Sequence, residues 1–180
     1  MDQDTKSSVV EGIPGPSFSQ GRPSGQALDS FSAHFRNGCC RQLFRYWLSK
    51  CDAQNIPCRA DIQPVQMKSL LSKLTLWDYV PEEETARLRL VGTELDHLLP
   101  VKPQGQLLAD VIPEDWMAVM RTQRHAFYKK RCPVYFTLSL ASLGRAHVQY
   151  ELLCLPLRKI GPETAMGIGL LDRLALQKAA

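Results

Sequence analysis

Histidines are the side chains of this chain that most often act as catalytic bases. Nucleophilic catalysis needs a thiol or hydroxyl beside a base and an orienting acid. Neither a G-x-S-x-G turn nor a catalytic-cysteine signature accompanies the histidines, and the acidic run 82–84 is expected to be a solvated turn. The sequence therefore favours a protein that is not an enzyme. The histidines considered are His34, His97, His125 and His147.

The six cysteines lack a metal-binding spacing. No C-x-x-C pair occurs, and no cysteine pair stands at zinc-finger distance from a histidine pair. We expect reduced thiols in the cytoplasm, with Cys132 and Cys154 buried as apolar side chains of strands. Cys39 and Cys40 are adjacent, so a bond between them would be strained. The remaining cysteines are Cys51 and Cys58.

Two short patterns match only the first part of known ligand-binding motifs. Gly167-Ile168-Gly169 opens like a dinucleotide fingerprint, yet a third glycine and room for a strand-helix-strand unit are missing. A tight strand of small residues is the better interpretation. Arg41 and Arg45 have the R-x-x-x-R spacing that cyclic dinucleotide receptors use, but the D-x-S-x-x-G partner of such sites is absent.

Charge and hydropathy exclude other classes of protein. The 180 residues carry a formal net charge of +4, with basic stretches at 36–59 and 121–131. A nucleic-acid surface would interleave such charges with exposed aromatic residues or carry a helix-turn-helix or RNA-binding signature; we find neither, and we expect solvated helix faces. No apolar run approaches the roughly 18 residues of a membrane span. The first residues also lack the basic and apolar regions of a signal peptide, so a cytoplasmic location is expected.

Hydrophobic periodicity predicts one α+β domain behind a disordered tail. Residues 1–30 are rich in glycine, proline and serine, and offer too little apolar surface to fold alone. A stripe repeating every four residues from Phe35 to Cys51 predicts an amphipathic helix. Further helices are expected at 65–74, 94–99 with Thr93 as the cap, 104–111, and from Pro113 to about Lys130.

Five strands are expected, at 74–80, 86–91, 134–140, 146–157 and 165–174. No helix separates the last three, so they should pair as an antiparallel meander. The alternation in the second strand places Arg87 and Arg89 on one face, and Leu88 and Leu90 on the buried face.

Three motifs along the chain resemble those of a known family. They are the aromatic end of a helix at 44–47, a P-x-R-x-D-x-x-P turn at 57–64, and an R-L-V-G-T-x-L junction at 89–95. Together they resemble the bacterial single-domain PAS-like family of the PAS_5 type, found in alphaproteobacterial regulators. The resemblance covers about residues 43–174. It implies a PAS-like domain over 31–176, with a five-stranded antiparallel sheet, helices on one face and an N-terminal amphipathic helix.

The resemblance also implies a signalling role. We expect a sensor or regulatory domain that binds a partner protein, with or without a small ligand, and PAS domains commonly form homodimers. The alternatives are a haem-binding or other small-molecule-binding sensor, or a small enzyme. No cofactor is expected, because the N-C-R-F-L-Q helix of flavin-binding PAS domains is missing and His125 is the single link to haem binding.

Candidate site residues follow from these elements. Arg59 and Asp61 are expected to be structural, and Arg89 is placed to reach a carboxylate. The predicted ligand pocket comprises Arg89, Leu90, Thr93, Leu95, His97, Leu98, Trp116, Met120, Phe127, Phe136 and Leu153. The predicted partner interface comprises Phe35, Arg41, Leu43, Phe44, Arg45 and Trp47.

Overall fold

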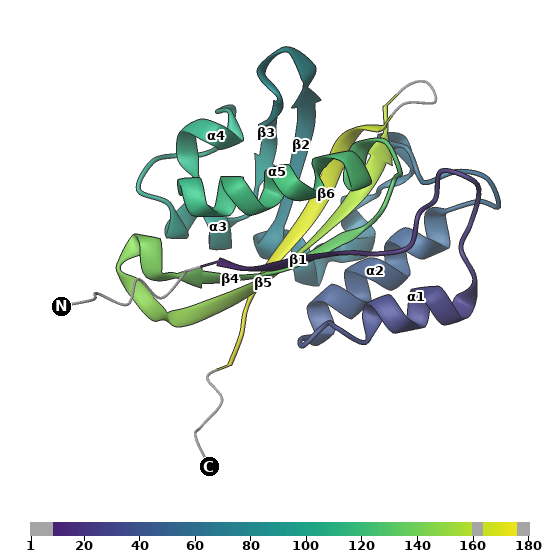
Figure 1. The fold of residues 1–180 in the computed structure, drawn as a ribbon, viewed down its shortest axis with the longest axis horizontal. Coiled ribbons are helices and arrows are strands. Elements are labelled where there is room, and N and C mark those ends of the chain that lie inside the picture. The colour runs from purple at the N-terminus through teal and green to yellow at the C-terminus, as the bar shows by residue number, and fades with distance from the viewer. Residues whose placement is uncertain (1–8, 160–163, 176–180) are drawn as a thin grey trace.

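The fold is a single antiparallel sheet with helices on both faces (Figure 1). The computed structural model describes residues 9–159 and 164–175. Within them, the strands are β1 (Val9–Pro14), β2 (Leu74–Val80), β3 (Thr85–Val91), β4 (Val134–Leu140), β5 (Arg145–Arg158) and β6 (Thr164–Arg173). The helices are α1 (Gly25–Ser32), α2 (Gly38–Lys50), α3 (Thr93–Leu98), α4 (Leu108–Val111) and α5 (Glu114–Tyr128). Short 3₁₀ segments are η1 (Arg59–Asp61), η2 (Pro64–Lys73), η3 (Pro81–Glu83) and η4 (Ala141–Leu143).

The five predicted strands are confirmed as one antiparallel sheet, to which a sixth strand is added. The strand order is β1-β4-β5-β6-β2-β3, and β4, β5 and β6 form the expected meander. The sixth strand, β1, lies in the segment that we predicted to be a disordered tail. It pairs with the edge of β4, so its backbone groups gain partners that no local sequence signal reveals. The expectation of a five-stranded sheet is therefore wrong.

The rest of the predicted tail also contributes to the core. Phe18 is 1% exposed and packs edge to face on Trp47, with ring centroids 5.0 Å apart. Leu28 and Phe31 of α1 are buried in the same cluster. These few apolar side chains cannot form a core of their own, but they complete one that the sheet and α2 begin. A disordered tail over 1–30 is thus contradicted at β1 and α1.

Each face of the sheet has its own core, which corrects the prediction of helices on one face. In Figure 1, α1 and α2 lie on one face of the sheet, and α3, α4 and α5 lie on the other. Leu153 and Leu155 of β5 belong to the cluster under α1 and α2, whereas Leu152 and Cys154 belong to the cluster under α5. This division follows the alternation of side chains along a strand.

The predicted N-terminal helix corresponds to α2, which begins at Gly38 and not at Phe35, and its apolar stripe is already occupied. Phe35, Leu43, Phe44 and Trp47 are 0–3% exposed inside the core on the α2 face. These four residues of the predicted partner interface are therefore unavailable to a partner in this fold. Arg41 donates to the carbonyl oxygens of Phe35 and Asn37. Arg45 alone among the predicted interface residues is exposed.

Several capping predictions change in the structure. Thr93 is the first residue of α3, and Gly92 occupies the N-cap position without a side-chain hydrogen bond. Arg59 and Asp61 act structurally, within the η1 turn that they belong to. Asp61 Oδ2 accepts from the backbone nitrogen of Cys58 at 2.8 Å, and the Arg59 guanidinium donates to the carbonyl of Ile62 at 3.1 Å. Both contacts stabilise the η1 turn.

Candidate functional site

A mostly apolar cavity of about 130 Å³ lies between α5 and the sheet. Its walls come from β2, β3 and α5, and from the facing side chains of β4, β5 and β6. Apolar and aromatic side chains dominate these walls, with a few polar groups among them. Such a combination is typical of small-molecule sites. We therefore take this cavity as the candidate site.

Alternation along β2 builds one wall of the cavity. Thr75, Trp77 and Tyr79 are spaced two apart and all line it. The indole N–H of Trp77 donates to the hydroxyl oxygen of Tyr128 at 3.0 Å. The Tyr79 and Tyr128 rings stack at 4.1 Å, and the Trp77 and Phe127 rings at 6.0 Å. An aromatic cluster thus joins β2 to the end of α5.

The Gly167-Ile168-Gly169 segment makes room for Trp77. A Cβ atom at Gly167 would lie 2.2 Å from Cζ2 of the indole, and one at Gly169 would lie 2.9 Å from Cζ3. Gly167 pairs with Trp77 in the β2–β6 ladder. The indole therefore lies across a groove that two glycines leave in β6, and the interpretation of this motif as a tight strand of small residues is confirmed.

Replacing Gly167 by alanine should destabilise the protein by about 1–3 kcal/mol, because the added methyl overlaps the Trp77 ring. The displaced indole should also change the tryptophan fluorescence. Gly38→Ala is the control: no atom lies within 4 Å of a Cβ at Gly38, and the change should be neutral or stabilising by up to about 1 kcal/mol. Urea denaturation measures both variants. Equal stability of Gly167→Ala and the wild type would contradict this packing.

The predicted pocket residues divide into two groups in the structure. Leu95, Trp116, Met120, Phe127 and Phe136 line the cavity. The other six do not, for reasons of position. Thr93, His97 and Arg89 are exposed, and Leu98 is buried in the neighbouring core. Leu153 faces α1 and α2 on the opposite side of the sheet.

A bulge moves Leu90 away from the cavity. Leu76 pairs with Leu90 and Trp77 pairs with Leu88, so Arg89 is an extra residue on β3. Leu88 therefore shares the cavity face with Trp77, whereas Leu90 shares the other face with Leu76 and is 41% exposed. The prediction that Leu88 and Leu90 share one buried face is wrong. Arg89 pairs with the carboxylate of Asp78, so the prediction that it reaches a carboxylate is confirmed.

Charged side chains lie where α5 meets the β2–β3 turn. Arg124 of α5 makes an ion pair with Glu84 at 3.0 Å and donates to the Glu84 carbonyl oxygen at 3.3 Å. Arg121 is paired with Glu114 on the same helix, and this hydrogen bond lowers the pKa of the Glu114 carboxyl. Arg121, Arg124 and Glu84 all line the cavity. Our sequence analysis missed all three, because their proximity depends on how α5 crosses the hairpin.

Most of the residues first considered for chemistry lie apart from this cavity. The four histidines are exposed and do not line it, and within the exposed acidic run 82–84 only Glu84 does. His125 is on α5 but does not line the cavity, which is also far too small for a porphyrin, so these residues do not fit a haem. Over residues 9–159 and 164–175, no three His, Cys, Asp or Glu residues gather as a metal site.

All six cysteines are free thiols. Cys132 and Cys154 are buried, as expected for apolar side chains in this region of the sequence. Burial raises the pKa of both thiols, and raises that of Cys51 to about 12. Low-pKa reactive cysteines are thus not formed at these positions.

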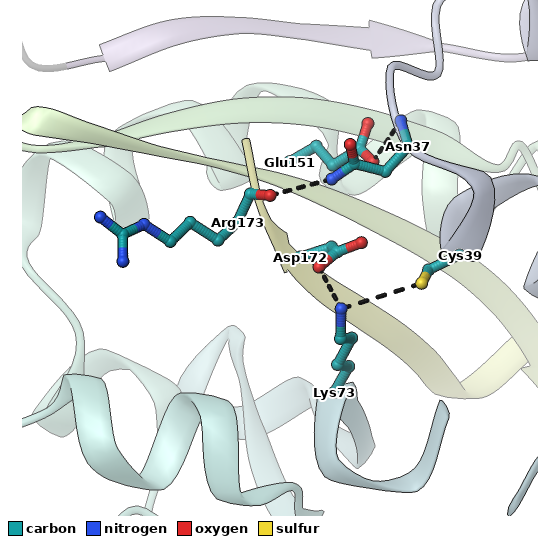
Figure 2. Close-up of polar contacts among 6 residues, drawn as sticks. All are labelled: Asn37, Cys39, Lys73, Glu151, Asp172 and Arg173. Carbon is teal, nitrogen blue, oxygen red and sulfur yellow. Dashed lines mark hydrogen bonds and ion pairs between the residues drawn. The ribbon is translucent and has the colours of Figure 1, made fainter. Parts of the chain in front are cut away.

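A second polar group joins the start of α2 to the sheet (Figure 2). The carboxylate of Glu151 is fully buried and accepts hydrogen bonds from the backbone nitrogens of Arg36 and Asn37 at 3.0 and 2.9 Å, and from the Tyr135 hydroxyl at 2.9 Å. Lys73 is paired with Asp172 and lies 3.8 Å from the sulfur of Cys39. These contacts satisfy the groups involved, so the arrangement is structural.

Comparison with known proteins gives one result. A family model described as PAS domain matches residues 36–172, about three quarters of the chain. No curated protein matches the sequence. The matched range contains α2, four of the five predicted strands, the fifth up to residue 172, and every residue that lines the cavity.

Proposed function

The chain belongs to the PAS domain family, and on that premise we propose that it is a regulatory domain that binds a small apolar ligand in the cavity under α5 and signals to a partner protein. PAS domains are generally sensory and not catalytic. The proposal places the domain in the cytoplasm, which is consistent with six unpaired cysteines. Across the described residues, no helix has the length and hydrophobicity that a bilayer span requires.

The size and lining of the cavity carry the ligand part of this proposal. Its volume is about 130 Å³, close to the roughly 150 Å³ of an apolar cavity that stays dry and binds benzene. Aromatic and methionine side chains line it, and methionine adapts its shape to different ligands. The cavity therefore suits a molecule of one ring or a short branched chain. It does not suit a large planar cofactor.

Toluene should bind the wild-type protein and raise its Tm, because a ligand that binds only the folded state stabilises it by mass action. A concentration 100-fold above Kd adds about 2.7 kcal/mol. Ala86→Ile is the matched control: Ala86 is buried on the cavity wall, so a larger side chain there fills the space. This variant should fold and show no Tm shift with toluene. An unresponsive wild type would contradict a ligand-binding cavity.

The partner part of the proposal concerns the outer face of α2. Arg45 is exposed there while the opposite side of the helix is anchored in the core. Arg45→Glu should therefore weaken a complex without altering the fold. Arg41→Glu is a poor probe of the same surface, because Arg41 holds backbone carbonyls at the start of the helix. A homodimer is a further proposal, and it cannot use the apolar stripe of α2 in this fold.

A further inference from the structure

The charged residues that line the cavity bring two guanidinium groups to it, each paired with a carboxylate, Arg121 with Glu114 and Arg124 with Glu84. The charged lining residues are Arg121, Arg124 and Glu84, two cations and one anion. Arg124 meets Glu84 where α5 passes the β2–β3 turn, Arg121 lies three residues earlier on α5, and the remaining lining is almost entirely apolar. An anionic group that took the place of the Glu84 carboxylate would meet the Arg124 guanidinium group, whereas a cationic group would be repelled by it.

Arg124 can exchange its present partner for a ligand. The Glu84 side chain that it pairs with is 70% exposed, and Arg124 itself is 33% exposed. Exposed ion pairs contribute little to stability, so breaking this one has a small cost. A carboxylate held partly out of water by the cavity would form stronger charge-assisted hydrogen bonds with the guanidinium group.

Thr85 adds a second polar group beside Glu84. It lines the cavity and is 7% exposed, and its hydroxyl oxygen has no hydrogen-bond partner among the described residues. A buried hydroxyl without a partner is unfavourable. A ligand oxygen that accepted a hydrogen bond from the Thr85 hydroxyl would remove this unfavourable contribution.

The apolar part of the cavity selects the rest of the ligand. Trp77, Trp116, Phe127 and Phe136 surround the space, and aromatic rings pack favourably on one another in offset or edge-to-face arrangements. The volume of about 130 Å³ admits one six-membered ring. A ring inside and an anionic group beside Arg124 match these two regions.

We infer that the ligand is a monocyclic aromatic carboxylate. Its ring lies against the aromatic wall, and its carboxylate binds Arg124 in place of Glu84 and accepts a hydrogen bond from Thr85. This inference rests on the proposed function, because it assigns a ligand class to the same cavity. Ligand exchange at Arg124 would also release the β2–β3 turn from α5.

Benzoate and benzamide test the inference, because the two have nearly the same shape and differ in charge. Isothermal titration of the wild-type protein should give a Kd for benzoate about tenfold or more below that for benzamide. Arg124→Gln should remove this difference by weakening benzoate alone. Glu84→Gln should tighten benzoate, because it removes the competing carboxylate. Arg45→Gln, on the opposite face of the molecule, is the control and should change neither Kd.

The outcomes separate this inference from the proposed function. If benzamide and toluene bind as tightly as benzoate, or if Arg124→Gln leaves the benzoate Kd unchanged, the carboxylate class is wrong and the apolar ligand site stands. If none of the three binds the wild type, both proposals fail. Tm measurements on each variant without ligand show whether the fold is retained, and Glu84→Gln provides an independent test should Arg124→Gln lose stability.

Discussion

Trp47→Ala should lower the free energy of unfolding by about 3–5 kcal/mol, the range for truncating a large aromatic side chain in a packed core. Trp47 is 0% exposed and contacts the rings of Phe18 and Phe44. Its indole N–H donates to the carbonyl oxygen of Pro156 on β5 at 3.0 Å. The substitution would leave a cavity and remove the donor from a buried carbonyl.

Two further variants separate the contributions to this effect. Trp47→Phe keeps a ring and loses the hydrogen bond, so its cost should be smaller than that of alanine. Arg45→Ala lies two residues away on the exposed side of α2 and should change stability by no more than about 0.5 kcal/mol. Urea denaturation with far-UV circular dichroism measures all three. A loss below about 1 kcal/mol for Trp47→Ala would show that α2 does not dock as described.

Glu151→Ala is expected to have an effect of similar size for a different reason. Its carboxylate accepts from the backbone nitrogens of Arg36 and Asn37 and from the Tyr135 hydroxyl. Removal leaves two backbone donors just before α2 and the Tyr135 hydroxyl of β4 without their acceptor. An unsatisfied buried donor costs about 1–3 kcal/mol, so the total loss should be at least about 3 kcal/mol.

The matched control for Glu151→Ala is Gln149→Ala on the same strand. Gln149 is exposed, and its replacement should stay within about 0.5 kcal/mol of the wild type. Glu151→Gln should fall between the two, because the amide keeps one acceptor and turns a donor toward the others. Equal stability of Glu151→Ala and Gln149→Ala would mean that water replaces the carboxylate without loss.

Strand-forming residues and breakers in the sequence predict the central elements of the fold well. The strand-forming residues of 74–80, and the run 134–140 after Pro133, predict β2 and β4 with their bounds, and Pro113 with its acidic followers predicts the start of α5. These signals are local, since strand propensity and helix starts depend on neighbouring residues. The family motifs lie in the same central region, which is why the PAS resemblance agrees with the matched range 36–172.

Non-local contacts explain the predictions that failed. The segment containing β1 has the composition of a disordered tail. Its stability comes from pairing with the edge of β4, more than 100 residues away in the chain. One bulged residue, Arg89, places Leu90 on the opposite face of the sheet from Leu88. No local sequence pattern indicates this bulge. Leu153 was assigned to the cavity because alternation shows that β5 has two faces but does not show which face α5 covers.

The sequence by itself determined the α+β class, the five central strands and an aromatic, apolar interior, because each depends on the spacing of neighbouring side chains. Tertiary structure alone decided the composition of the candidate site. Leu95, Trp116 and Phe127 line the cavity, as the sequence analysis predicted. Trp77 was not predicted there, and it lines the cavity because two glycines of β6 leave space for its ring. Arg124 meets Glu84 because α5 crosses the hairpin there, 40 residues away in the sequence. Contacts between distant segments depend on how whole elements pack, and that information is spread over the entire core and not held in any single motif.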